Sequence, residues 1–266
     1  MKGFSVGIDD MALYVPSLYL PIKTIAAERG ISYEKLNKGL GLENLAIPDV
    51  HEDTATMAAN AVVEIIEKNQ LDPTTIGRIY LGTESALDGA KPTATYVLEM
   101  LRRKYRGQYG KKCLLNCDVV DLTFACVGGV DALQNTIDWV SGSEDRVGVV
   151  VASDNAKYEL GSSGEYTQGA GAVAILVKKN PRLLAIDATW GVATLGVHDF
   201  YKPKLKGNFP TASLGLFANH FVRNDITLPI TPYSITNYDS IKNLDSFWLI
   251  RDKYNRRATI ERFNYH

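Results

Sequence analysis

One stretch of the sequence constrains the fold more than any other: a strand-like segment at 114–120 is followed by Cys126 and then by a helical pattern. In that pattern apolar residues recur at intervals of three or four, which places them on one face of a helix. These residues are Val127, Val130, Leu133, Ile137 and Val140. A strand that leads through a short turn into an amphipathic helix is typical of α/β layered domains.

The position of Cys126 favours a reactive thiol. At a helix N-terminus the unpaired N–H groups and the positive end of the helix dipole favour a thiolate, and a lowered pKa makes a cysteine nucleophilic. Gly128 and Gly129 in the first helical turn each cost about 1 kcal/mol against alanine, which predicts a close approach of this backbone to a neighbouring helix or a ligand. The alternative is a buried structural cysteine, because free cysteine is among the most buried residue types.

The composition of the chain excludes several classes of protein. Its 266 residues suffice for one large domain or two smaller ones, and the net charge of −1 gives no nucleic-acid footprint and no basic membrane-binding face. No segment reaches the ~18 uncharged apolar residues of a spanning helix, and the N-terminus lacks the order of a signal peptide. Three cysteines argue against a disulfide framework, and no second ligand pair accompanies Cys113 and Cys117 for zinc. We therefore expect a soluble, cytoplasmic protein with free thiols and no metal.

Hydrophobic periodicity predicts the order of the elements. Helices are expected at 22–28, at 33–40, from Asp53 or Thr54 to Asn69, at 93–105, after Cys126, and as one short helix within 241–254. Strands are expected at 1–14, 79–82, 114–120, 147–152, 172–177 and 182–190, the last as the antiparallel neighbour of 172–177. This order predicts an α/β layered domain.

Polar side chains follow three of the expected strands. Glu84, Cys126 and Asp154 each come after a strand, and they would converge on one pocket if those strands were neighbours. Partial burial would raise the pKa of Glu84 towards the range that suits acid–base chemistry. The alternative for Glu84 is a solvated loop glutamate.

Three strings stand out for their order and spacing: Gly82-Thr83-Glu84, Ala125-Cys126-Val127-Gly128-Gly129 and Asp199-Phe200-Tyr201-Lys202-Pro203. With these strings the chain resembles the 3-hydroxy-3-methylglutaryl-CoA synthases of the thiolase superfamily, over about residues 4–203. The resemblance implies a thiolase-like α/β fold, in which two similar halves pack as five layers. This chain would hold a complete N-terminal half at 1–178, the start of a second half at 179–203, and a divergent tail at 204–266. The tail shows no long periodic pattern, which allows disorder there.

The resemblance also implies a mechanism. Cys126 would be the nucleophile that acetyl-CoA acetylates, and Glu84 the general acid/base that deprotonates the acetyl methyl. The resulting carbon would attack acetoacetyl-CoA, and hydrolysis would release the product for the mevalonate pathway of isoprenoid biosynthesis. Other family positions that shape the site are Asp88, Asp154, Thr167 and Asp199. The family implies a homodimer with coenzyme A thioesters as substrates, no resident cofactor, no metal, no nucleic acid and no membrane.

The histidines depart from the family pattern. The family supplies a catalytic histidine from its second half in a Phe-His-Ser/Thr-Pro setting, and none of His51, His198, His220 and His266 has that setting, although His220 is an outside candidate. The alternative function is therefore a truncated, catalytically incomplete remnant or scaffold of the family, whose exposed apolar face would favour dimerisation or poor solubility. A ketoacyl synthase is a third interpretation, against which the Glu84 string argues.

Overall fold

A computed structural model describes residues 5–123, 127–162, 164–187, 190–192, 247–251 and 258–263. The chain divides into two units, Met1–Trp190 and Gly191–His266. The division at 1–178, 179–203 and 204–266 expected from the sequence stays a prediction.

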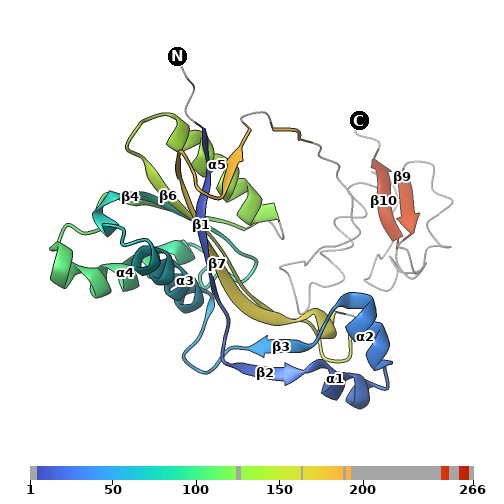
Figure 1. Cartoon of the computed structure of the whole chain (residues 1–266). Coiled ribbons are helices and arrows are strands. Elements are labelled where there is room, and N and C mark those ends of the chain that lie inside the picture. Colours follow the sequence, from blue (N-terminus) through green and yellow to red (C-terminus); the bar gives the residue numbers. More distant parts are fainter. Residues whose placement is uncertain are drawn as a thin grey trace. The chain divides into compact units, whose positions relative to one another are not determined.

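A six-stranded sheet forms the centre of the first unit (Figure 1). In spatial order its strands are β5 (Asp118–Leu122), β4 (Ile76–Gly82), β6 (Val147–Ala156), β7 (Gly169–Lys179), β1 (Val6–Tyr14) and β8 (Leu184–Ile186). β4 is parallel to both β5 and β6, whereas the pairs β6–β7, β7–β1 and β1–β8 are antiparallel. The parallel part of the sheet is the part that carries the candidate site.

Helices cover both faces of this sheet. α3 (Thr54–Lys68) and α4 (Thr93–Tyr109) lie against one face and α5 (Gly128–Ser141) lies against the other (Figure 1). Alternation along β6 matches these two faces, because Val149 and Val151 join the core beneath α3 and α4 while Val150 joins the core beneath α5. The predicted α/β layered architecture is therefore confirmed.

The sequence predicted α3 closely. Asp53 caps it, since the Asp53 carboxylate accepts the Thr56 N–H at 2.8 Å and the Thr56 hydroxyl accepts the Asp53 N–H at 2.7 Å. Six apolar residues at helical spacing form its buried face: Met57, Ala58, Ala61, Val62, Ile65 and Ile66.

A small lobe at 18–47 extends from the sheet. It contains β2 (Leu18–Pro21), α1 (Ile22–Arg29), α2 (Tyr33–Leu40) and β3 (Asn44–Ile47), and β2 pairs with β3 in a separate two-stranded sheet. Its own core consists of Ile22, Ile25, Ala26, Leu36 and Leu45. Both helices were predicted, and Gly30 ends α1 in the left-handed conformation with φ of +61°. The two short strands were not predicted.

The expected strand at 114–120 is displaced. The strand β5 runs from Asp118 to Leu122, and Leu114, with φ of +56°, lies in a turn before it. The expected face of α5 is also partly wrong, because Val127 and Val130 are exposed. Gly128, Ala132 and Thr136 are buried in addition to Ile137 and Val140, since small residues allow α5 to approach the sheet closely.

The partner expected for the last strand is wrong. β8 pairs with β1 and not with β7. The reason is that β6 and β1 already occupy the two edges of β7, so a strand that follows β7 must pair elsewhere.

In the second unit, β9 (Phe247–Arg251) and β10 (Ala258–Phe263) form an antiparallel pair. The helix expected within 241–254 is therefore wrong over β9. A short apolar run cannot be assigned to helix or strand from periodicity alone, which explains the error. No helix among the described residues combines the length and the apolar character needed to cross a membrane.

Candidate functional site

The strands β5, β4 and β6 lie side by side, with β4 in the centre and parallel to both of its neighbours. Gly82 at the end of β4 is in register with Leu122 of β5 and with Ala152 of β6. A further bond of 3.1 Å from the Thr83 N–H to the Leu122 carbonyl extends the pairing beyond β4. The three strands are thus neighbours, as the convergence of Glu84, Cys126 and Asp154 requires.

Asp154 organises the segment after β4. Its Oδ1 atom accepts three hydrogen bonds, from the Thr83 hydroxyl at 3.1 Å, the Glu84 N–H at 2.8 Å and the Ser85 hydroxyl at 3.0 Å. The sequence placed Asp154 after a strand that ends at Ala152, whereas β6 continues to Ala156 because Asp154 pairs with Gly171 of β7. Asp154 therefore fixes the backbone of Glu84 from within a rigid sheet.

Glu84 itself has an exposed side chain, as the loop interpretation predicts. Its backbone is held by Asp154. Its general acid/base role stays a prediction.

Asp88 lies in the same segment and stabilises a turn. Its carboxylate accepts hydrogen bonds from the Ala90 N–H at 2.7 Å and the Lys91 N–H at 3.0 Å, and from the Tyr96 hydroxyl at 3.3 Å. The bonds from the Lys91 and Ala90 N–H groups lower the pKa of Asp88, so the carboxylate is ionised near neutral pH. Asp88 orders the approach to α4, and its role in the site stays a prediction.

The start of α5 presses against these strand ends. A Cβ atom on Gly82 would meet the Gly129 nitrogen at 2.3 Å, and a Cβ on Gly128 would meet the Leu122 carbonyl oxygen at 2.5 Å. The close approach expected from the two glycines is thus present, and the neighbours are strand ends. The helix that the sequence places after Cys126 is confirmed and begins at Gly128.

Two of the expected site residues, Cys126 and Asp199, lie outside the described residues. Thr123, after β5, and Val127, before α5, are the described residues that flank 124–126. The nucleophilic role of Cys126 therefore stays a prediction, supported by the contact between the start of α5 and the end of β4.

Thr167 belongs to a different segment. It ends the 3₁₀ turn Glu165–Thr167, is exposed, and donates its hydroxyl to the Gly164 carbonyl at 2.7 Å. Arg29 of the 18–47 lobe forms two 2.8 Å bonds to the Glu165 carboxylate. The structure thus attaches the turn of Thr167 to the lobe, and the place of Thr167 near a substrate stays a prediction.

Asp121 is a residue that the sequence analysis missed. Its carboxylate accepts the Thr93 N–H at 2.5 Å and the Ala94 N–H at 2.9 Å, and so caps α4 from β5. Pro92, the residue before α4, makes no side-chain cap. The sequence could have indicated such a residue, because the first N–H groups of a helix need an acceptor and proline offers none from its side chain.

Residues 2–181 match the family model described as hydroxymethylglutaryl-coenzyme A synthase, N terminal. The chain belongs to the hydroxymethylglutaryl-coenzyme A synthase family. The resemblance identified from the sequence strings, and the thiolase-like α/β fold of an N-terminal half, are therefore confirmed.

Relatives in this family match about three quarters of the chain. The hydroxymethylglutaryl-CoA synthase of Haloferax volcanii is 39% identical over 202 residues, which is 75% of this chain and 44% of that protein. A structure of MvaS in complex with 3-hydroxy-3-methylglutaryl coenzyme A has a TM-score of 0.69 at 38% identity, and covers 77% of this chain and 47% of that chain. A crystal structure of HMG-CoA synthase complexed with CoA has a TM-score of 0.68 at 33% identity, and covers 76% of this chain and 49% of that chain. The chain spans about half the length of the synthases that it matches.

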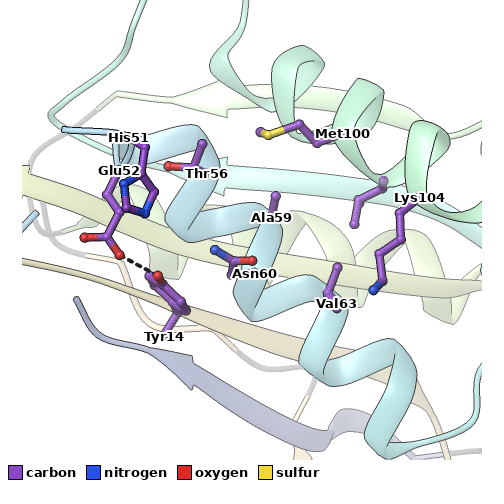
Figure 2. A pocket seen from close by; sticks show the side chains of 10 residues that line it. Tyr14, His51, Glu52, Thr56, Ala59, Asn60, Val63, Met100 and Lys104 are labelled. Carbon is purple, nitrogen blue, oxygen red and sulfur yellow. Dashed lines mark hydrogen bonds between the residues drawn. The ribbon is translucent and has the colours of Figure 1, made fainter. Parts of the chain in front are cut away.

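A cavity of about 280 Å³ lies between α3, α4 and the end of β1 (Figure 2). In Figure 2 the Tyr14 hydroxyl points at Glu52 and donates to its carboxylate at 2.5 Å. The Asp49 N–H and this hydroxyl lower the pKa of Glu52, and the same bond raises the pKa of Tyr14. Among the described residues expected in the site, none of Glu84, Asp88, Asp154 and Thr167 lines this cavity.

Proposed function

We propose that this chain takes part in the hydroxymethylglutaryl-CoA synthase reaction, the condensation of acetyl-CoA with acetoacetyl-CoA through an acetyl-cysteine intermediate. Two neighbouring contacts carry the proposal. Asp154 holds the backbone of Glu84, and the end of β4 at Gly82 packs against the first turn of the helix that follows Cys126. Family membership and the CoA and hydroxymethylglutaryl-CoA complexes of similar structures support the choice of thioester substrates. The product would enter the mevalonate pathway.

The first step is acetyl transfer. The Cys126 thiolate attacks the carbonyl carbon of acetyl-CoA, a carbon–sulfur bond forms, and coenzyme A leaves as the thiol after taking a proton. Backbone N–H groups in the first turn of α5 suit the oxyanion that develops during this attack. The glycines at 128 and 129 let this turn approach the strand ends.

The second step is carbon–carbon bond formation. Glu84 removes a proton from the acetyl methyl, the carbon attacks the ketone of acetoacetyl-CoA, and the new alkoxide takes up a proton. Water then hydrolyses the cysteine thioester and frees the product. A positioned general acid/base contributes about 10²–10⁴-fold to rate, which is the scale we assign to Glu84. Asp88, Asp154, Thr167 and Asp199 shape the site, and no metal or resident cofactor takes part.

The homodimer is also proposed. Several large apolar side chains are exposed in the single chain. Met11 and Leu13 lie on β1, Val127 precedes α5, and Val130 lies in the first turn of α5. Exposed apolar groups of this kind favour association.

The alternative is a chain of this family that performs only part of the reaction. Radiolabelled acetyl-CoA tests both. Label on Cys126, absent from Cys126→Ala and retained in the control Cys117→Ser, supports the nucleophile. Product after addition of acetoacetyl-CoA supports the full reaction, whereas label without product supports the partial one. No label on the unmodified chain would overturn the nucleophile and the proposed function.

A further inference from the structure

The segment 83–92, which connects β4 to α4, carries Glu84 and consists mostly of exposed residues. Its start is fixed by the three bonds to Asp154 of β6. Its end is fixed at the first two residues of α4, whose N–H groups both donate to Asp121 of β5. Carboxylates from the two strands that flank β4 therefore hold opposite ends of the Glu84 segment.

The link from Asp121 reaches into the segment itself. Thr93, which donates its N–H to Asp121, is buried, and its hydroxyl accepts the Leu87 N–H at 3.0 Å. A chain of hydrogen bonds thus runs from β5 through Thr93 to the middle of the segment. Hydrogen bonds to a carboxylate are about twice as strong as neutral ones, so the bonds to Asp121 are the strongest in this series of hydrogen bonds.

We infer that Asp121 is a positioning residue for the reaction, which holds the Glu84 segment in register with the strand ends at which the chemistry occurs. This inference rests on the proposed function. Asp121 acts through Thr93 and the segment, and its bonds are to backbone N–H groups rather than to the reacting atoms.

A purely structural explanation exists, namely that Asp121 caps α4 and stabilises the fold. The two explanations predict different effects of an Asp121 substitution on the individual reaction steps. Loss of a cap lowers stability and affects every step alike, whereas loss of positioning slows the step that depends on Glu84 more than the acetylation of Cys126. Misplacement of a catalytic group by about 1 Å costs about 10²-fold in rate.

The test separates acetylation from proton removal. The whole chain is incubated with acetyl-CoA in D₂O, and mass spectrometry of the Cys126 peptide follows both the acetyl label and the exchange of its methyl protons. We expect Asp121→Asn to acetylate within about threefold of the wild type and to exchange methyl protons about 10- to 100-fold more slowly. Asp72→Asn, which alters an exposed cap of the turn Pro73–Thr75, is the matched control and should change neither rate.

A second variant separates the cap from the positioning. Thr93→Val keeps both backbone bonds to Asp121 and removes the acceptor of the Leu87 N–H. We expect it to slow methyl exchange while amide hydrogen exchange at Thr93 and Ala94 in α4 stays as slow as in the wild type. In Asp121→Asn, amide exchange should accelerate at Thr93, Ala94 and Glu84.

The outcomes decide between the explanations. Equal slowing of acetylation and methyl exchange in Asp121→Asn, or wild-type rates for both, would overturn the positioning role and leave the proposed function standing. Acetylation without methyl exchange in the wild type would overturn the role of Glu84 and the inference with it. No acetylation of the wild type would overturn the proposed function, and then unchanged amide exchange in Asp121→Asn would separately show that Asp121 does not hold the segment.

Discussion

The carboxylate of Asp154 accepts a 2.8 Å hydrogen bond from the backbone N–H of Glu84, which follows the neighbouring strand of the same sheet. Asp154→Ala removes the acceptor of this bond and of the bonds from Thr83 and Ser85. Because buried Thr83 would lose a partner, we expect a loss of about 1–3 kcal/mol in the free energy of unfolding.

The same substitution should slow formation of the condensation product more than it slows acetylation of Cys126. We expect condensation product to form about 10- to 100-fold more slowly, because Glu84 would no longer be held against the strand ends. Labelling of Cys126 and product formation are measured in parallel, and in a chain that only acetylates, methyl exchange replaces product as the readout. Asp145→Asn, at an exposed turn, is the control. Wild-type rates in Asp154→Ala would contradict this role.

The contact between β4 and α5 predicts opposite effects for two glycine substitutions. Gly82→Ala would place its Cβ 2.3 Å from the Gly129 nitrogen, so strands or helix must shift, and we expect a loss of about 1–3 kcal/mol or more. Gly107→Ala lies in the exposed interior of α4 with open space around it, and should gain about 1 kcal/mol. Urea unfolding of both variants gives the comparison. Equal stability of the two would show that α5 does not press on β4.

Local signals in the sequence predicted the elements whose ends and faces are set by near neighbours. Asp53 and Thr56 cap α3 reciprocally, and both residues lie within four positions of one another. The partner of β8 could not be predicted this way, because it depends on β1 having taken the free edge of β7. Asp121 was missed for the same reason: it caps a helix that begins 28 residues earlier in the chain. Residues joined only by the folded sheet leave no periodic pattern in the sequence.

The candidate site shows the same division. The sequence predicted that Glu84 and Asp154 would converge if their strands were neighbours, because parallel strands end at one edge. The structure supplies that condition, since β4 and β6 are adjacent and parallel. That Asp154 lies inside β6 could not be predicted, since it depends on pairing with the small residues around Gly171. When the pairing strand is unknown, a polar residue that follows an apolar run cannot be assigned to the inside of the strand or to the loop after it.

The ion pair between Arg29 and Glu165 predicts an acid-dependent attachment of the Thr167 turn. Arg29, together with the Gly161 N–H, lowers the pKa of Glu165 from 4.5 to about 2. The folded pKa is below the unfolded one, so the ionised carboxylate stabilises the fold above pH 4.5, and this contribution is lost as the pH falls towards 2. We expect the difference in Tm between the wild type and Glu165→Gln to be largest above pH 5 and to shrink below pH 4.5.

The control for that pH series is Glu159→Gln, an exposed glutamate in the preceding turn. Its difference from the wild type should stay small over the same range. Asp10, which Lys68 holds at a pKa of about 2, loses its contribution in the same window. Because both Glu165→Gln and the wild type keep Asp10, its effect cancels in their difference. A difference that is independent of pH would contradict the assignment to Glu165.

Asp9 on β1 forms a buried ionic cluster that fastens the chain between β7 and β8. Its fully buried carboxylate accepts from Lys178 Nζ at 3.0 Å and from Arg182 Nη2 at 2.7 Å and Nε at 3.0 Å. Burial alone would raise the pKa of Asp9, but the bonds from Arg182 and Lys178 outweigh it and hold the pKa below 3.8. The ionised cluster therefore contributes to stability above that pH.

The two sides of this cluster should respond unequally to substitution. Asp9→Asn leaves Arg182 and Lys178 able to reach water, since their side chains are 58% and 35% exposed, and we expect a loss of about 1–3 kcal/mol. Arg182→Gln leaves a buried carboxylate with one cation and should cost more than Asp9→Asn, because the charge of Asp9 stays buried. In urea unfolding, the double variant should lose about 0.5–3 kcal/mol less than the sum of the two single losses, because each removes the same interaction. Strict additivity would mean that the Asp9 and Arg182 side chains are not coupled.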